Sequence, residues 1–281
     1  MKKVVLLDGA VGTSLWAKSS DRDPVWRYNM EKPDLVRELV GEYVQAGAQI
    51  VLANSFAVNR ISLKKSSWQA PEVAARAVQL AREGAQGAAR VALSVGPLPV
   101  LMEPYGDLEE DEAYEMFLEV MQAGVQAGAD VLMVQTFMDL AMMQVALKAA
   151  ATLGTPTMAA FSFEARGRTM MGNSVADIVE GLADFDLEAI GLNCSLGPEQ
   201  ALPILQEFAQ HTERPLLFKP NAGLPVGGQE NPAVDAHAFA EEVSKAAALG
   251  ATYIGGCCGS NPAYIRALAD KLRLMGALAQ G

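Results

Sequence analysis

The chain has 281 residues, 51% of them hydrophobic and 20% charged, a composition typical of a soluble globular protein and not of a disordered or fibrous one. Its formal net charge of -11, with Lys and Arg scattered along the chain, argues against nucleic acid or an anionic membrane surface as its partner. No apolar run approaches the roughly 18 residues that span a bilayer, and the one after Lys3 stops at Asp8, too early for a signal peptide, so we expect a cytoplasmic protein.

Short apolar runs rich in Val, Ile and Leu recur along the whole chain and predict eight strands. Most of them lack the apolar/polar alternation of a half-exposed strand, which indicates parallel strands buried on both faces. In chain order the runs are VVLLDG (4–9), QIVLANS (49–55), RVALSVGP (90–97), DVLMVQT (130–136), TMAAFSF (157–163), AIGLNC (189–194), LLFKPNA (216–222) and YIGGCCG (253–259).

The segments between these runs carry the signals of helices. Residues 32–49 have a proline in the first turn and reach a glycine, Gly47, near their end. Residues 108–130 begin with a cluster of carboxylates, which stabilise the amino end of a helix through its dipole. Strand and helix signals therefore alternate along the chain.

One phrase is repeated and shows how the alternation is built. AGAQIVLANS (46–55) returns as AGADVLMVQT (127–136) and as LGATYIGGCC (249–258). Each copy is a helix that ends at a glycine and leads directly into a strand, so the repeated unit is one helix-to-strand step. Eight such steps without a long polar linker predict an α/β fold, a single-domain (β/α)8 TIM barrel over residues 1–281, with a doubly wound open sheet as the alternative.

In barrels of this kind the chemistry lies on the loops that follow the carboxyl ends of the strands. All three cysteines of the chain, Cys194, Cys257 and Cys258, fall at such positions and therefore on one rim. The polar residues that the sequence places there are Asp8, Asn54, Ser55, Gln135, Glu164, Asn193, Cys194, Lys219, Asn221, Cys257 and Cys258.

The three thiols predict a metal site. The sixth and eighth strands are near neighbours around a closed barrel, so Cys194 can approach the cysteine pair. Neighbouring side chains of a strand point to opposite faces, so Cys257 and Cys258 can share one ion only where the backbone leaves strand geometry. The glycines at 255, 256 and 259 allow such a departure.

Three soft thiolates favour zinc, and three protein ligands with an open fourth position are the catalytic pattern. His211 and His237 fall in predicted helices away from the rim, and we expect neither to be a ligand. Two other interpretations of the cysteines remain open: small buried apolar side chains, and a vicinal disulfide between Cys257 and Cys258.

A zinc ion with three thiolates has a characteristic use. The ion contributes two positive charges and the ligands three negative ones, so a fourth thiol that binds there loses its proton yet stays electron-rich. We expect such a substrate thiolate to attack a methyl group on a good leaving group. Activation of water is the rival use, but three thiolates make the ion a poor Lewis acid.

Six motifs in this order resemble the homocysteine S-methyltransferase family, which includes betaine–homocysteine methyltransferases and the homocysteine module of cobalamin-dependent methionine synthase. They are DGAVGT (8–13), ANSF (53–56), GRTMMG (167–172), GLNC (191–194), KPNAGLP (219–225) and GGCCG (255–259), and together they span almost the whole chain. The resemblance implies a zinc-dependent enzyme that methylates homocysteine to methionine, with Cys194, Cys257 and Cys258 as the catalytic metal ligands.

The resemblance also implies a substrate pocket. Asp8 would bind the ammonium group of homocysteine, although its other interpretation is a turn residue that caps the following segment. Backbone amides of Gly9, Ala10, Asn54 and Ser55 would hold the carboxylate. Asn193 and Gln135 complete the predicted substrate-binding set.

Gln135 departs from the family, whose members usually have glutamate at this strand end. Its carbonyl can still accept a hydrogen bond from an ammonium group, but the negative charge is absent. Glu164 and Asp139 are two carboxylates that could compensate.

The sequence leaves the methyl donor and two other functions open. The donor would be betaine, a sulfonium such as S-methylmethionine, or a methylcorrinoid protein. A lysine at a strand end, Lys219, is also where barrel lyases form a Schiff base. A barrel that binds zinc or homocysteine as a regulator without catalysis is the third possibility.

Overall fold

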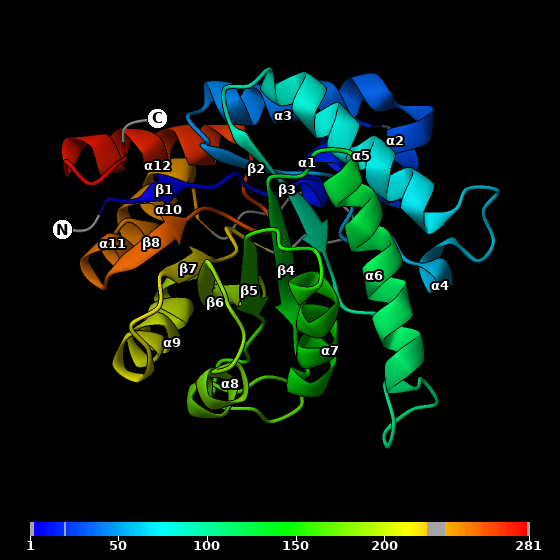
Figure 1. Ribbon diagram of the computed structural model, residues 1–281. Coiled ribbons are helices and arrows are strands. Elements are labelled where there is room, and N and C mark those ends of the chain that lie inside the picture. The colour runs from blue at the N-terminus through cyan, green and yellow to red at the C-terminus, as the bar shows by residue number, and fades with distance from the viewer. Residues whose placement is uncertain (1–2, 20, 224–233, 280–281) are drawn as a thin grey trace.

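Eight parallel strands surround the centre of the protein (Figure 1). The computed structural model describes residues 3–19, 21–223 and 234–279. Within them the strands are β1 (Val5–Leu6), β2 (Ile50–Leu52), β3 (Arg90–Val95), β4 (Val131–Phe137), β5 (Thr157–Phe161), β6 (Ala189–Asn193), β7 (Leu216–Lys219) and β8 (Ala251–Ile254). All eight predicted strands are confirmed.

The strands are hydrogen bonded in the order β1-β8-β7-β6-β5-β4-β3-β2. A parallel bridge between Leu7 and Ile50 joins the two ends of this sheet. Gln49 N donates to Leu6 O at 2.7 Å and Asp8 N to Ile50 O at 3.2 Å across the same junction. The sheet therefore curves into the predicted (β/α)8 TIM barrel and is not an open doubly wound sheet.

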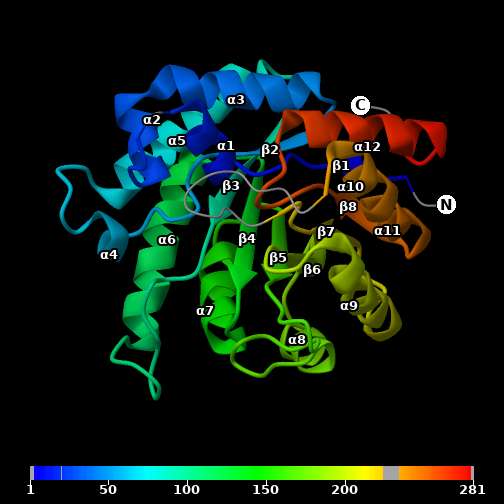
Figure 2. The ribbon, with the colours of Figure 1, turned by 180° about the vertical axis from the view of Figure 1, so that it is seen from behind.

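Helices cover the outside of the barrel, as both views show (Figures 1 and 2). Those that follow the strands in the described residues are α1 (Gly12–Lys18), α2 (Tyr28–Glu31), α3 (Pro33–Gln45), α4 (Arg60–Leu63), α5 (Ala70–Ala85), α6 (Glu110–Gln126), α7 (Leu140–Ala151), α8 (Val175–Gly181), α9 (Pro198–His211), α10 (Ala236–Val243), α11 (Lys245–Ala248) and α12 (Pro262–Leu274), with a 3-10 turn at Val25–Arg27. None of these helices is long and apolar enough to cross a membrane.

The repeated helix-to-strand step has one backbone conformation in its three copies. Gly47, Gly128 and Gly250 have φ angles of 107°, 99° and 91°, in the left-handed region that glycine adopts without a steric penalty. Each glycine stops a helix and turns the chain into the next strand.

Two apolar clusters form the core: a large one between the strands and the helices, and a smaller one inside the barrel. The smaller cluster consists of Leu7, Ile50, Leu52, Ala92, Val131, Met133, Met158, Ala160, Ala189, Leu217 and Tyr253. Side chains two residues apart on a strand share a face. The last interior side chains of β3, β4, β5 and β7 are followed, two residues later in each strand or just after it, by Ser94, Gln135, Ser162 and Lys219. All four are buried, so the barrel interior becomes polar at its carboxyl end.

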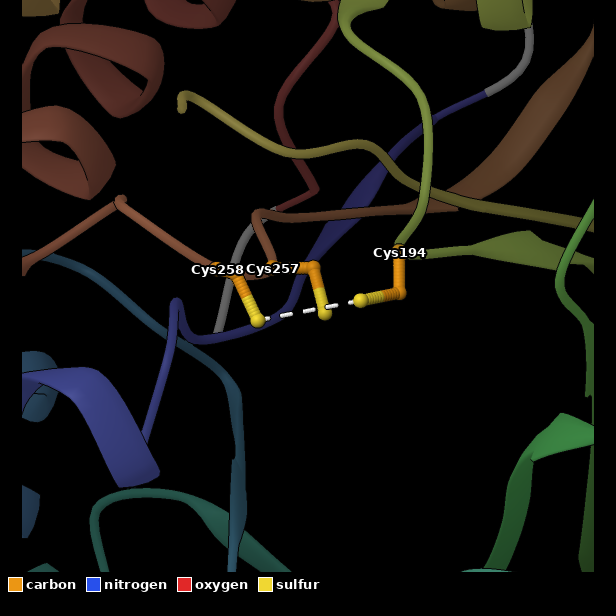
Figure 3. Close-up of side chains that lie close together, drawn as sticks. All are labelled: Cys194, Cys257 and Cys258. Atoms are coloured by element: carbon orange, nitrogen blue, oxygen red, sulfur yellow. Dashed lines mark hydrogen bonds between the residues drawn. The ribbon is translucent and has the colours of Figure 1, made fainter. Parts of the chain in front are cut away.

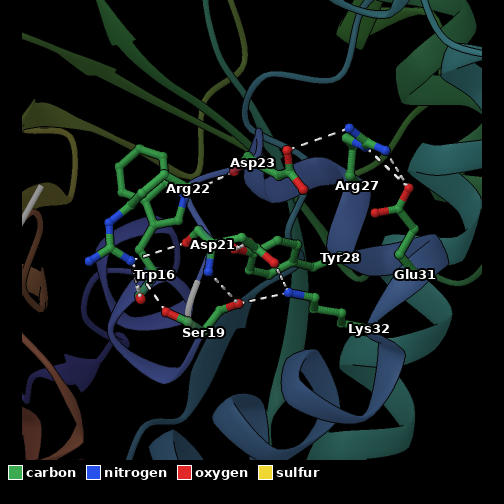
Figure 4. Close-up of polar contacts among 9 residues, drawn as sticks. All are labelled: Trp16, Ser19, Asp21, Arg22, Asp23, Arg27, Tyr28, Glu31 and Lys32. Atoms are coloured by element: carbon green, nitrogen blue, oxygen red, sulfur yellow. Dashed lines mark hydrogen bonds and ion pairs between the residues drawn. The ribbon is translucent and has the colours of Figure 1, made fainter.

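The loop after α1 is fastened by its own polar contacts (Figure 4). The Asp21 carboxylate accepts hydrogen bonds from Lys32 Nζ and the Tyr28 hydroxyl, and these contacts lower the pKa of Asp21 to about 2. Asn29, in the helix that follows, donates to Asn54 O at 2.8 Å. The loop is thereby tied to the end of β2 on the rim.

Candidate metal and substrate site

The three cysteines converge at the carboxyl end of the barrel (Figure 3). Cys194 follows β6 directly, Cys257 and Cys258 follow β8, and their sulfur atoms all lie within 4.8 Å of one another. The sulfurs of Cys194 and Cys258 are 3.7 Å apart. Ligands at the usual zinc–sulfur distance of about 2.3 Å in a tetrahedron are separated by about 3.8 Å, so the cluster has the dimensions of a zinc site.

The thiols are free, and no disulfide joins Cys257 to Cys258. In the described parts of the chain, this trio is the only group of His, Cys, Asp or Glu side chains identified as able to hold a metal ion. His211 ends α9, and His237 lies in α10 with 86% of its side chain exposed; neither belongs to the cysteine group identified in the described residues.

The backbone around the cysteines departs from strand geometry, as the glycines predicted. Cys194 and Ser195 have φ angles of 63° and 58°, a left-handed conformation that costs free energy for residues other than glycine. After β8 the chain turns at Cys257, whose carbonyl accepts from Ser260 N at 3.1 Å. Gly259 has φ 80° in this turn, where a Cβ would lie 2.5 Å from Gly223 O. Because of this turn, the side chains of the consecutive residues Cys257 and Cys258 can both point toward Cys194.

The thiols have unequal proton affinities. Hydrogen bonds from Cys257 and Cys258 lower the pKa of Cys194 to about 3, whereas donating to Cys194 raises the pKa of Cys258 to about 12. The pKa of Cys257 also rises well above its ordinary value because of its bond to Cys194. Cys194 is therefore the first of the three thiols to lose its proton.

Two asparagines lie against the cluster. Asn193 Nδ2 is 3.8 Å from Cys257 Sγ. The buried amide of Asn221 has no hydrogen-bond partner at bonding distance among the described residues, yet it lies close enough to Cys194 to help lower the pKa of that thiol. The sequence placed Asn221 on the rim without a role.

Asp8 lies on the rim as predicted but is already engaged. Its side chain is 1% exposed, and Oδ1 accepts a hydrogen bond from Lys219 Nζ at 2.8 Å. Oδ2 accepts from Leu52 N at 2.7 Å. The residue that caps the following helix α1 is Val11, so Asp8 acts as half of a buried ion pair and not as a helix cap.

The predicted carboxylate-binding amides lie beside this pair. Gly9 packs closely, since a Cβ there would be 2.7 Å from Ser260 Oγ. Ala10 N donates to Ser260 O at 3.3 Å, and Ser55 N donates to Ala53 O at 2.8 Å. The Asn54 side chain donates to Val25 O at 2.7 Å, which links β2 to the loop after α1.

Gln135 has one free acceptor. Its Nε2 donates to Ser94 Oγ at 2.8 Å, while Oε1 is buried without a hydrogen-bond partner within the described residues. Asp139 caps α7 by accepting from Ala141 N, and Glu164 is exposed, so neither carboxylate is buried with Gln135. An acceptor that is buried and unpaired is suited to a donor group on a ligand.

Sequence reasoning missed Ser94 and Thr136. Ser94 reads as an ordinary strand residue, and only the pairing of β3 with β4 places it under Gln135. Thr136 has φ 67° at an irregularity in the pairing of β4 with β5, and no signal in its sequence neighbourhood indicates that conformation.

Comparison with known proteins places these features in context. The family model described as homocysteine S-methyltransferase matches residues 5–272. Methionine synthase of Mycobacterium tuberculosis is 28% identical over 95% of this chain, and that of Mycobacterium leprae is 27% identical over 95%. The chain spans about a quarter (24%) of the length of these two curated relatives.

Solved structures with the same architecture include the homocysteine methyltransferase MmuM of Escherichia coli. Its apo form is 26% identical with a TM-score of 0.77, and the comparison covers 96% of each chain. Its metallated form is 24% identical with a TM-score of 0.83 and the same coverage, a likeness that concerns the fold.

Proposed function

The chain belongs to the homocysteine S-methyltransferase family, and from that premise we propose that it transfers a methyl group to the sulfur of homocysteine, forming methionine. The observation that carries the proposal is the convergence of Cys194, Cys257 and Cys258 within 4.8 Å at the carboxyl end of the barrel. A cluster of this kind can hold one ion and still leave a coordination position for a substrate thiol.

The three cysteines would hold Zn²⁺. When bound, zinc supplies the acidity that keeps an acceptor thiol as a nucleophilic thiolate at neutral pH. The cysteines must stay reduced to bind it, which fits the cytoplasm as the proposed location.

The residues of the chain would orient both the cluster and the substrate. Asn193 fixes Cys257 through its amide, and the strained backbone at Cys194 aims that sulfur toward the pair. The free Oε1 of Gln135 would accept a hydrogen bond from the substrate. Together with Asp8, the amides at Gly9, Ala10, Asn54 and Ser55 remain the proposed site for its amino-acid end.

The exposed apolar side chains favour a donor carried by a protein. Large apolar residues that are exposed within the described residues include Phe56, Leu101, Tyr105 and Met170, between 41% and 73% exposed, on the loops after β2, β3 and β5. These loops lie at the same end of the barrel as the thiols. A methylcorrinoid protein would cover them, whereas betaine or S-methylmethionine would leave them exposed.

A donor screen tests the function. Zinc-loaded protein is incubated with homocysteine and betaine, S-methylmethionine or a methylcobalamin-loaded protein, and methionine is measured. We expect formation of methionine with at least one donor, and its loss in Cys194→Ser. A protein that contains one zinc ion and binds homocysteine but turns over no donor would instead be a regulator.

Lys219 offers a poor Schiff-base nucleophile. Its side chain is 2% exposed, and its ammonium group is hydrogen bonded to Asp8. Borohydride trapping with a carbonyl substrate should therefore leave no adduct, and an adduct on Lys219 would favour the lyase.

A further inference from the structure

The charge at the amino-acid end of the site is set by one ion pair. Among the buried residues that the structure describes, Asp8 and Lys219 are the only charged ones. Lys219 Nζ lies 2.8 Å from Asp8 Oδ1. A buried carboxylate that is already paired with a cation offers little net attraction to a second cation such as the ammonium group of an amino acid.

Both partners of the ion pair are hydrogen bonded through their backbones to the segments that carry the thiols. Lys219 pairs with Asn193 in the β6–β7 register, and its carbonyl accepts from Cys194 N at 3.0 Å. The Asp8 carbonyl accepts from Gly256 N at 3.0 Å, one residue before Cys257. The pair is thus connected through the backbone to both parts of the cysteine cluster.

A glycine lets the pair form. Lys219 is on β7 and Asp8 follows β1, with β8 between them. Gly255, directly after β8, is two residues beyond the interior residue Tyr253, and a Cβ there would lie 2.7 Å from Asp8 O and 2.8 Å from Leu7 Cβ. Lys219 therefore reaches Asp8 across a position that has no side chain.

The lysine keeps donors to spare. An ammonium group has three N–H donors, and within the described residues Lys219 Nζ donates to Asp8 Oδ1. Gln135 and Asn221, the other buried side chains on this rim with unused polar atoms among the described residues, are both neutral. The rim thus offers a buried cation and neutral acceptors, but no buried carboxylate other than the paired Asp8 within the described residues.

We propose that Lys219 is a specificity-determining residue that makes the site recognise the carboxylate of the acceptor thiol and not its ammonium group. The acceptor class then includes anionic thiols without an amino group. This inference rests on the proposed function, because it concerns the substrate of the same thiol-binding site.

The test compares three thiols on zinc-loaded protein without a methyl donor, by isothermal titration calorimetry. They are L-homocysteine, 4-sulfanylbutanoate, which lacks the ammonium group, and 3-aminopropane-1-thiol, which lacks the carboxylate. We expect loss of the ammonium group to weaken binding less than about threefold and loss of the carboxylate to weaken it about tenfold or more, because hydrogen bonds to charged groups are the stronger ones.

Lys219→Met should reverse this order, because Asp8 then has no cation and pairs with the substrate's ammonium group. Asp8→Asn/Lys219→Met removes both charges, and there the three thiols should bind within about threefold of one another. This second variant also serves if an unpaired Asp8 prevents folding of the first. Lys271→Met is the matched control, since its ion pair with Glu241 joins two outer helices and its loss should leave the order unchanged.

The outcomes separate the two proposals. If homocysteine binds and 4-sulfanylbutanoate binds tenfold more weakly or worse, the inference about Lys219 is wrong while the proposed function stands. If Lys219→Met keeps the wild-type order, the inference is also wrong. If none of the three thiols binds, the proposed function fails and the inference fails with it.

Discussion

Asn193 and Thr136 bind each other through two hydrogen bonds, although β5 lies between their strands. Thr136 N donates to Asn193 Oδ1 at 2.8 Å, and Asn193 Nδ2 donates to Thr136 Oγ1 at 2.7 Å. The same Nδ2 is 3.8 Å from Cys257 Sγ. The left-handed backbone of Thr136 therefore serves to fix an asparagine against a predicted metal ligand.

Asn193→Ala should weaken zinc binding by about 10- to 100-fold, because side chains that orient metal ligands typically contribute that much to affinity. Competition with a chromophoric chelator measures the change. Asn59→Ala is the control. The side-chain oxygen of Asn59, like that of Asn193, accepts a hydrogen bond from a backbone N–H, in this case that of Ser62 at 2.8 Å at the start of α4. Equal zinc affinity in wild type and Asn193→Ala would show that Asn193 has no influence on the metal.

Zinc affinity should rise steeply with pH. The pKa of Cys194 is lowered to about 3, so it is already a thiolate at pH 7. The pKa of Cys257 is raised and that of Cys258 is raised to about 12, so these two stay protonated. Binding by all three then releases two protons, and the logarithm of the affinity should increase with a slope of about 2 per pH unit between about pH 6 and 8.

The slope can be measured by competition titrations at several pH values. In Cys258→Ser one of the two protonated thiols is absent, so the slope should fall to about 1. A wild-type slope near 3 would mean that Cys194 is protonated as well, and it would contradict the unequal proton affinities.

Gln135→Glu should tighten homocysteine binding by about tenfold, because it replaces an unpaired amide oxygen with a carboxylate that can pair with the ammonium group. The Michaelis constant for homocysteine measures the effect, and 4-sulfanylbutanoate should gain nothing. Gln144→Glu, on the outer helix α7, controls for the added charge. A Michaelis constant that stays the same in Gln135→Glu would refute the prediction.

Gly191→Ala should destabilise the barrel by about 1–3 kcal/mol or more, as overpacked core positions do. A Cβ at Gly191 on β6 would lie 1.9 Å from Leu217 O, a backbone atom of β7 that cannot move without disturbing the sheet. Gly197→Ala is the control, because no atom lies within 4 Å of the Cβ position there. Denaturant titration compares the two, and equal midpoints would show that β6 and β7 separate at little cost.

Much of the fold follows from local patterns. The eight apolar runs predicted the eight strands because both faces of a parallel strand are buried, and the glycines at 47, 128 and 250 marked the helix ends because only glycine takes the left-handed conformation cheaply. The part of the KPNAGLP motif at Leu224 and Pro225 lies outside the described residues.

The metal cluster was also predictable. The barrel rule sends every strand end to one rim, so three cysteines at the ends of the sixth and eighth strands had to be neighbours there, and the glycines around Cys257 and Cys258 indicated the turn that both thiols require. Neither the prediction of the barrel nor that of the cysteine cluster needs knowledge of contacts between residues far apart in the sequence.

The pairing of side chains across the rim was decided by the tertiary structure alone. Lys219 and Asp8 are 211 residues apart, and Thr136 and Asn193 are 57 apart. Whether a carboxylate such as Asp8 is free or already neutralised depends on strand order, on register and on the missing side chain at Gly255. These are properties of the closed barrel, because the free energy of a buried charge is set by the neighbours that packing brings within a few ångströms, and those neighbours come from distant parts of the chain.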